Sequence, residues 1–172
     1  MAGDERCEQC GFVWGAITAD QVRDRLGSAT DAFVAVIEDA GAFAHERPSR
    51  ERWSILEYGA HLRDVLISIR ERIIAASIED EPIGQPIHRD ERVTLGFYQF
   101  DLPDDITLEL RAASGLFGRT FEALAPDSTH REFTYSPVTP RKVTILWATA
   151  QAVHECEHHL GDVRENLARL TR

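Results

Sequence analysis

Residues 146–170, LWATAQAVHECEHHLGDVRENLARL, combine a continuous apolar seam with a dense polar cluster. The apolar side chains recur at steps of three and four: Leu146, Ala150, Val153, Cys156, Leu160, Val163, Leu167 and Leu170. This rhythm matches the 3.6-residue period of an α-helix that buries one face. We therefore expect a helix that starts after Pro140 and runs nearly to the C-terminus.

Three earlier segments show the same period. The first spans residues 19–43, and the second follows ERPSRER at residues 46–52. The third follows LPDD at residues 102–105, with Asp104 as the expected N-cap, and ends before Pro126. Their seams are Val22, Leu26, Ala29, Phe33, Val36 and Ala40; Ile55, Gly59, Leu62, Leu66, Ile69, Ile73 and Ala76; and Ile106, Leu110, Ala113, Phe117 and Leu124. Four amphipathic helices, with little that reads as strand, predict an all-α fold, a four-helix bundle.

Residues 79–103 form a long irregular link between the second and third helices. A link of this length can cross from one end of a bundle to the other, and such loops often cover a functional site. We interpret Phe97, Tyr98 and Phe100, within LGFYQF, as an apolar plug for the open side of the bundle. A short strand in this link is the alternative.

The composition is that of one globular domain spanning residues 1–172. A chain of this length, 43% apolar and 28% charged, can bury one full core but rarely two. No apolar run approaches the ~20 residues that cross a bilayer, and the acidic start MAGDERCEQCGF is unlike a signal peptide, so we expect a cytoplasmic protein with no membrane partner. The formal charge of −10 repels a phosphate backbone and argues against nucleic acid as a partner.

The polar cluster begins with His154-Glu-x-x-His158, which is the sequence motif of a zinc-peptidase helix. In the metzincin form of this motif a glycine breaks the helix, and a third histidine follows six residues after the second. Arg164 stands at that position, and the apolar seam continues through Gly161. We therefore reject a peptidase.

The apolar seam sorts the cluster into two pairs, because helical positions advance about 100° per residue. With Leu160 turned to the core, Glu155 and His159 share one flank of the helix, and His154 and His158 share the other. Each pair has the i, i+4 spacing at which two side chains of one helix reach the same ion.

His61 lies one step from the seam of the second helix and so borders the bundle interior. With Glu155 and His159 it makes a candidate three-ligand site for Zn²⁺, with Ni²⁺ or Fe²⁺ as alternatives, and with a position left for water or substrate. The phrases His61-Leu-Arg-Asp64-Val and His159-Leu-Gly-Asp162-Val indicate that each aspartate could support its histidine through the second ring nitrogen. The alternative for this histidine is a hydrogen-bonded residue at the edge of the core.

The other pair, His154 and His158, has a complement in Cys7-x-x-Cys10, which is followed by Gly-Phe as in a zinc knuckle. Two thiolates and two imidazoles would complete a closed tetrahedral site for a second, structural Zn²⁺. That ion would dock residues 1–17 on the bundle. A redox pair, or two unrelated thiols, is the alternative.

The phrases WSILEYGAHLRDV at residues 53–65 and HECEHHLGDV at residues 154–163 resemble the DinB-like metal-binding four-helix-bundle superfamily. This superfamily includes mycothiol-dependent maleylpyruvate isomerase and bacillithiol S-transferases. The opening CEQCGF resembles an actinobacterial branch of it.

The resemblance implies a divalent metal held by one histidine of the second helix and two ligands spaced four apart on the last helix. Carried over, these ligands are His61, Glu155 and His159, and the pair His154 with His158 is the alternative register on the last helix. The resemblance also implies that a homodimer forms through a face of the bundle.

Two functional hypotheses follow for the chain. In the first it is a metal-dependent S-transferase or isomerase, in which the metal activates a low-molecular-weight thiol such as mycothiol, or a water, for attack on an electrophilic small molecule. In the second it is a non-catalytic metal-binding or stress-response module whose zinc is structural.

Overall fold

The computed structural model describes residues 5–136 and 139–172 and is mostly helical. Four long helices form a bundle: α1 (Val22–Ala40), α2 (Ile55–Ile78), α4 (Pro103–Glu122) and α5 (Ile145–Leu170). The shorter elements are helix α3 (Arg89–Thr94), strands β1 (Glu132–Thr134) and β2 (Lys142–Thr144), and the 3₁₀ helices η1 (Trp14–Ala16), η2 (Ala19–Gln21), η3 (Gly41–His45) and η4 (Pro126–His130). The predicted four-helix bundle is confirmed. None of the described helices is both long and apolar enough to span a membrane.

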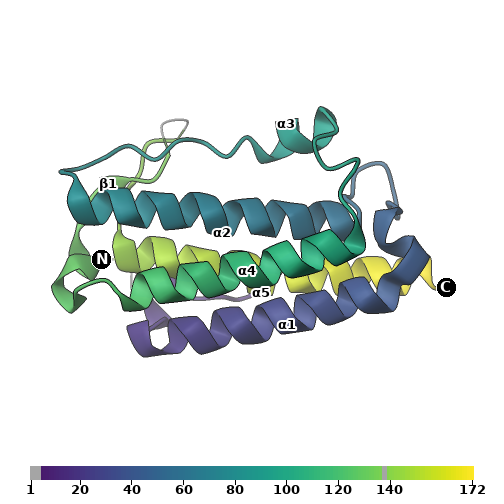
Figure 1. Cartoon of the computed structure of the whole chain (residues 1–172), viewed down its shortest axis with the longest axis horizontal. Coiled ribbons are helices and arrows are strands. Elements are labelled where there is room, and N and C mark those ends of the chain that lie inside the picture. The colour runs from purple at the N-terminus through teal and green to yellow at the C-terminus, as the bar shows by residue number, and fades with distance from the viewer. Residues whose placement is uncertain (1–4, 137–138) are drawn as a thin grey trace.

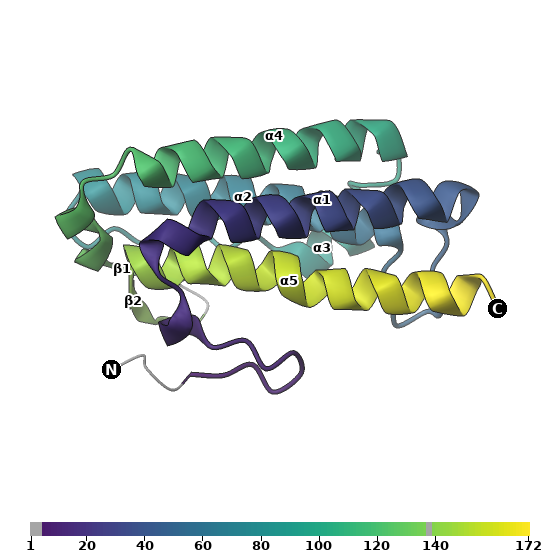
Figure 2. The ribbon, with the colours of Figure 1, turned by 90° about the horizontal axis from the view of Figure 1, so that it is seen from below.

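The spatial order of the helices depends on one long connection. Both α1 and α2 pack on α4 and α5, and they lie diagonally opposite each other (Figure 1, Figure 2). α2 and α4 run in the same direction, from right to left in Figure 1. Two parallel neighbours need a connection that returns along the bundle, and the chain between α2 and α4 makes this crossover, as expected.

The apolar seams expected from the sequence form the core. Phe33 of α1, Leu66 of α2 and Phe117 of α4 have no exposed surface. Gly59 allows α4 to approach α2 closely, because an added Cβ would lie 2.7 Å from Ile106 Cγ2. The helices therefore pack as the periodicity predicts.

The starts of two helices illustrate capping. The Ser54 side chain accepts a hydrogen bond from the Glu57 backbone N–H, and the Glu57 carboxylate accepts one from the Ser54 N–H, which makes a capping box at the start of α2. Asp104 is not the N-cap of α4, so this expectation is wrong. The helix begins at Pro103 with Leu102 as N-cap, because proline suits a first position whose N–H would have no helical partner.

A two-stranded antiparallel hairpin, which the sequence did not predict, lies at the end of the bundle where α5 begins. Phe133 of β1 pairs with Val143 of β2, and both are buried. Thr134 also forms a parallel bridge to Ile83 of the crossover. Three-residue strands are too short for alternation to reveal them.

The crossover runs along one side of α2 and contains helix α3 rather than a strand (Figure 1). Tyr98 is buried and donates a hydrogen bond of 2.9 Å to Asp64. Phe97 and Phe100 are 65% and 84% exposed, so the interpretation of these two residues as a plug is wrong. The turn after α3 buries Tyr98 together with Val93 of the helix, and leaves the two phenylalanines in solvent.

The N-terminal segment of residues 5–17 lies along α5 (Figure 2). Arg6 and Val13 form an antiparallel bridge that closes a loop around the two cysteines. Phe12 and Ile17 are buried. Residues 1–4 of the expected docked segment lie outside the described residues.

Candidate metal centre

Three donor side chains meet between α2 and α5. His61 of α2 is 2% exposed and lies beside Glu155 and His159 of α5. His61 Nε2 and His159 Nε2 lie 3.4 Å and 3.3 Å from Glu155 Oε2, and the donor atoms of the three residues are all within 4.8 Å of one another. Ligands at about 2.1 Å from a tetrahedral ion are ~3.4 Å apart. The predicted group therefore comes together with the spacing of a metal site.

The phase of α5 explains which side chains meet. Glu155 and His159 face α2, whereas His154 and His158 form a group with the cysteines of the N-terminal segment. In the described part of the chain, no donor group joins the histidine of α2 to the second pair, as the alternative register would require. α5 is also continuous through Gly161, so the helix break of a metzincin motif does not occur.

The two aspartates expected to support the histidines differ in role. His159 Nδ1 lies 2.7 Å from Asp162 Oδ2, which leaves Nε2 for an ion. Asp64 instead accepts hydrogen bonds from Arg92 and Tyr98, so its expected contact with His61 is wrong. The Nδ1 atom of His61 has no hydrogen-bond partner among the described residues.

The centre carries a fixed negative charge. Burial favours the neutral carboxyl of Glu155, but hydrogen bonds with His159 and His61 outweigh burial and hold its pKa well below the usual value of 4.5. Burial lowers the pKa of His159, whereas its contacts with Asp162 and Glu155 raise it to about 9. Protons therefore compete with a metal for this imidazole.

Two further contacts fix the carboxylate of the centre. Gln151 Nε2 donates a hydrogen bond of 2.6 Å to Glu155 Oε1, and Trp14 Nε1 donates one of 2.7 Å to Gln151 Oε1. Trp14 belongs to the N-terminal segment, so a residue outside the bundle supports the carboxylate of Glu155 indirectly, through Gln151. Sequence reasoning missed the first contact although Gln151 and Glu155 are four residues apart on one helix. It missed the second because nothing local in the sequence connects positions 14 and 151.

The donor set fits a divalent ion. Two imidazole nitrogens and one carboxylate oxygen suit Zn²⁺, Ni²⁺ or Fe²⁺, and three protein ligands leave a position free for water or substrate. His61 Nε2 and His159 Nε2 both face Glu155 Oε2, so these three atoms are the ones that an ion would bind.

Comparison with known families identifies the family of the chain. A model described as the DinB superfamily matches residues 18–163. The chain belongs to the DinB superfamily. The matched range contains all three residues of the centre, His61, Glu155 and His159, and leaves out Cys7 and Cys10.

Among solved structures, this DinB protein is similar to YfiT from Bacillus subtilis, which is described as a probable metal-dependent hydrolase with an unusual four-helix bundle topology. The identity is 17%, the TM-score is 0.82, and the match covers 98% of this chain and 95% of YfiT. At this identity the likeness shows the fold alone. No curated protein matches the chain.

In this DinB protein, the centre borders a pocket of about 450 Å³ beneath the crossover, and His61 and Glu155 form part of its wall. Arg72 of α2 lines the pocket and is largely buried. Among the described residues, Arg72 donates a hydrogen bond to the Gln85 carbonyl, and its guanidinium lies 4.6 Å from the ring centre of Tyr135. Its Nε has no hydrogen-bond partner within the described ranges.

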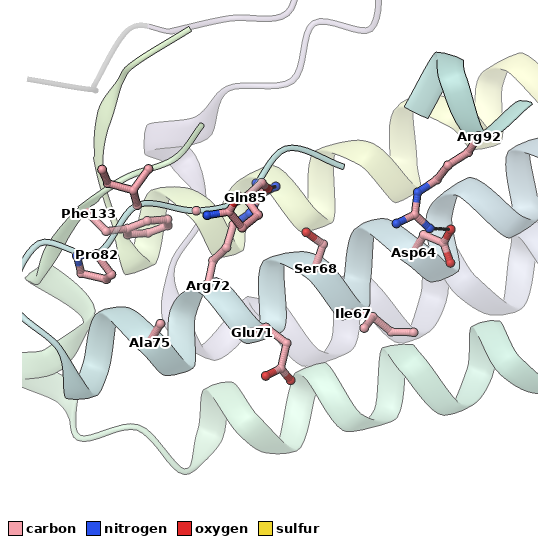
Figure 3. Close-up of a pocket in the computed structure, with 12 residues that line it drawn as sticks. Asp64, Ile67, Ser68, Glu71, Arg72, Ala75, Pro82, Gln85, Arg92 and Phe133 are labelled. Atoms are coloured by element: carbon pink, nitrogen blue, oxygen red, sulfur yellow. Dashed lines mark hydrogen bonds and ion pairs between the residues drawn. The ribbon is translucent and has the colours of Figure 1, made fainter. Parts of the chain in front are cut away.

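A second cavity of about 420 Å³ adjoins this pocket, and both are lined by Ser68 and Arg72 (Figure 3). Figure 3 shows Arg72 rising from α2 toward Gln85 of the crossover, while Asp64 and Arg92 pair at the other end of the cavity. Sequence reasoning missed Arg72, because a charged residue beside an apolar seam usually reads as solvated surface.

Tyr135, which follows β1, forms another part of the pocket wall. Burial raises the pKa of Tyr135 to about 12, although the charge of Arg72 opposes this rise and that of Glu155 adds to it. The phenol therefore keeps its proton near neutral pH and can act as a hydrogen-bond donor. The hairpin that the sequence did not reveal thus contributes to the site.

The second predicted group of ligands also comes together. One donor atom each from Cys7, Cys10, His154 and His158 lies within 4.8 Å of the others. All three cysteines of the chain are free thiols. The segment that carries the two N-terminal thiols is thus placed against the outer flank of α5.

Proposed function

We propose that this protein is a metal-dependent enzyme that uses a low-molecular-weight thiol, such as mycothiol, in an S-transfer or isomerisation reaction. His61, Glu155 and His159 would hold the ion, for which Zn²⁺ is our first choice. The observation that carries the proposal is the convergence of these three donors, two of which, His61 and Glu155, line a pocket. A site with three protein ligands and one free position is the arrangement of a catalytic zinc.

The metal, when bound, would lower the pKa of a coordinated thiol or water, so that the nucleophile is anionic near neutral pH. The residues around the site orient the ligands: Gln151 holds the carboxylate of Glu155, and Asp162 holds the imidazole of His159. Tyr135 lies at the same pocket and is the candidate donor of a hydrogen bond to an oxygen of the substrate.

The two adjoining cavities support a reaction with two organic substrates. Their volumes are about 450 Å³ and 420 Å³, and they meet at Ser68 and Arg72. A hydrolase needs room for one organic substrate and a water, whereas a thiol transferase needs room for the thiol and the electrophile together. A thiol cosubstrate also favours the cytoplasm as the place of reaction, since thiols stay reduced there.

Arg72 indicates that one of the substrates is an anion. Among the described residues no carboxylate forms an ion pair with this buried guanidinium, and a carboxylate on the electrophile would give it a direct anionic partner. We therefore expect electrophiles with a carboxylate to react faster than their esters.

The test uses zinc-loaded protein with mycothiol and a carboxylate-bearing electrophile such as maleylpyruvate, with product followed by mass spectrometry. His61→Ala and His159→Ala should each lose the zinc of this centre and at least ~100-fold in thiol-dependent turnover. His130→Ala removes an exposed histidine of η4 and should retain both properties. Arg72→Met should raise KM for the anionic substrate by ~10-fold or more, since a charge-assisted hydrogen bond contributes about 1.5–3 kcal/mol.

Each contrary outcome has a distinct meaning. Unchanged zinc content in both His61→Ala and His159→Ala would eliminate the centre. Zinc-dependent turnover without thiol would make the protein a hydrolase, as YfiT is described to be. Bound zinc with no turnover of either kind would leave the second candidate, a non-catalytic metal-binding module, which the four-ligand group at Cys7 and Cys10 favours.

A further inference from the structure

Four residues form a second group of candidate metal ligands: Cys7 and Cys10 lie before the range that matches the DinB superfamily model, and His154 and His158 lie within it. Cys7 and Cys10 contribute their sulfur atoms, and His154 and His158 contribute one ring nitrogen each, all within 4.8 Å of one another. Cys7 Sγ lies 3.8 Å from His158 Nδ1. Sulfur and nitrogen ligands at about 2.3 Å and 2.05 Å from a tetrahedral Zn²⁺ are ~3.6 Å apart, so the group has the dimensions of a zinc site.

His154 supplies independent evidence for a ligand. Its side chain is 9% exposed, and neither ring nitrogen has a hydrogen-bond partner in the part of the chain that the structure describes. The ring packs against Phe12 and Trp14, with ring centres 5.1 Å and 4.6 Å apart. A buried imidazole without a partner costs free energy that coordination of one nitrogen would recover.

The cysteine loop is already in the shape that a zinc site needs. The Cys7 N–H donates to the Phe12 carbonyl at 2.8 Å, and the Gly11 N–H donates to the Cys7 carbonyl at 2.9 Å. Gly11 has φ +76°, a conformation that favours glycine and that turns the chain back toward α5. Cys10 is exposed while the other three ligands are covered to different degrees, so an ion can enter without unfolding of the bundle.

A series of side-chain contacts also connects this group to the candidate metal centre. The loop continues into Trp14, which stacks on Trp147 at 6.2 Å and donates to Gln151, the residue that in turn donates to Glu155. The segment that the ligands fasten to α5 therefore contains the first link of a hydrogen-bond chain that ends on a carboxylate of the centre.

We propose that Cys7, Cys10, His154 and His158 bind a second Zn²⁺ in a closed, structural site. Four protein ligands leave no position for a substrate. The ion fastens the N-terminal segment to the flank of α5 and keeps the Trp14 and Gln151 side chains in place. This last step rests on the proposed function, whereas the binding of the second ion does not.

The experiment is a titration of metal-free full-length protein with Co²⁺ and, in parallel, with Zn²⁺. Wild-type protein should bind two ions, and Co²⁺ should give the intense thiolate-to-metal absorption of cysteine ligation. Cys7→Ser with Cys10→Ser should bind one ion and lose that absorption. Cys156→Ala, which removes a buried thiol outside the group, should keep two ions and the full absorption.

The complementary variant separates the two sites. His61→Ala with His159→Ala should bind one Co²⁺ and keep the thiolate absorption, so failure of the candidate centre leaves the second site measurable. If the cysteine variant does not fold, the wild-type titration decides the question alone. One bound ion without thiolate absorption in wild-type protein would overturn the proposal, as would two ions in a folded cysteine variant.

The link to the centre has its own readout. Trp14→Phe keeps an aromatic ring against Trp147 and removes the donor to Gln151. We expect this variant to retain the second ion and to bind zinc at the centre ~3-fold to 10-fold more weakly. Loss of a residue that hydrogen-bonds directly to a metal ligand usually has a larger effect, and Trp14 acts only through Gln151. Equal zinc affinity in Trp14→Phe and wild type would remove the positioning role and leave the second site intact.

Discussion

Two aspartates in nearly identical sequence phrases have different partners in the structure. Asp162 and Asp64 each follow a histidine by three residues, and the sequence predicts the same role for both. Asp162 contacts His159, whereas Asp64 is bonded to Arg92 and Tyr98 of the crossover. The crossover has no periodicity that predicts where its side chains fall, so the local phrase alone did not distinguish the two aspartates.

The grouping of the ligands was more accessible to prediction. Positions 154, 155, 158 and 159 lie on one helix, and the phase of a helix decides which of them point the same way. Arg72 and Tyr135 were missed, because their role depends on a contact between elements that are distant in the sequence. Gln151 was missed although it lies one turn before Glu155 on the same helix.

At this scale we predict an effect of Asp162→Asn on metal affinity. The change keeps the size of the side chain and removes the charge that faces His159 Nδ1, so zinc affinity at the centre should fall ~10-fold to 100-fold. The measurement is competition with a chelating dye in the Cys7→Ser, Cys10→Ser background. Asp64→Asn is the matched control and should leave the affinity unchanged; equal losses in the two variants would contradict the assignment.

Among the elements, long periodic helices followed the sequence closely, and short or irregular ones did not. The seam residues within α1, α2 and α4 are buried as expected, whereas four of the eight seam residues of α5 are only half-buried: Leu146, Leu160, Leu167 and Leu170. The hairpin of β1 and β2 escaped notice because each strand has three residues, and α3 because a helix of six residues completes fewer than two turns. Residues of α3, and Tyr135, Ser136 and Thr139 between the two strands, line the pocket beside the centre, so the sequence located the ligands but not the pocket.

The start of α2 carries a pH-dependent contribution to stability. Burial raises the pKa of Glu57, but its hydrogen bonds with Arg47 and the Ser54 N–H outweigh burial, so the folded-state pKa lies below the usual 4.5. A carboxyl with a lowered pKa stabilises the fold above its unfolded pKa, and this contribution is lost as the pH falls through the folded-state value.

We therefore predict that Glu57→Gln is less stable than wild type near neutral pH and loses less stability on acidification below about pH 5. Urea denaturation at a series of pH values measures this difference. Ser54→Ala should lower the free energy of unfolding by about 1 kcal/mol near neutral pH, because it removes the side chain that caps the start of α2. Parallel profiles for Glu57→Gln and wild type would show that the carboxylate makes no such contribution.

On the scale of the whole molecule, the candidate centre connects α2 to α5, and the second site connects the N-terminal segment to α5. An ion held between two such elements binds the folded chain and not the unfolded one, so it stabilises the fold by mass action. The bundle itself has a complete apolar core, and should therefore remain folded without metal.

We predict that a strong chelator lowers the thermal midpoint without abolishing the cooperative transition. At free zinc 100 times above Kd, each site adds about 2.7 kcal/mol. Calorimetry of wild type, of Cys7→Ser with Cys10→Ser, and of His61→Ala with His159→Ala should show two, one and one zinc-dependent increments. A midpoint that does not respond to chelation in wild type would mean that neither ion is bound by the native state.

The two ligand pairs alternate along one turn and a half of α5, and this arrangement affects how the sequence evolves. Glu155 and His159 depend on α2, whereas His154 and His158 depend on Cys7 and Cys10. In homologous genes that have lost the N-terminal thiols, selection on positions 154 and 158 should relax while positions 155 and 159 stay under constraint. Neighbouring codons of one helix are thus expected to evolve at two different rates.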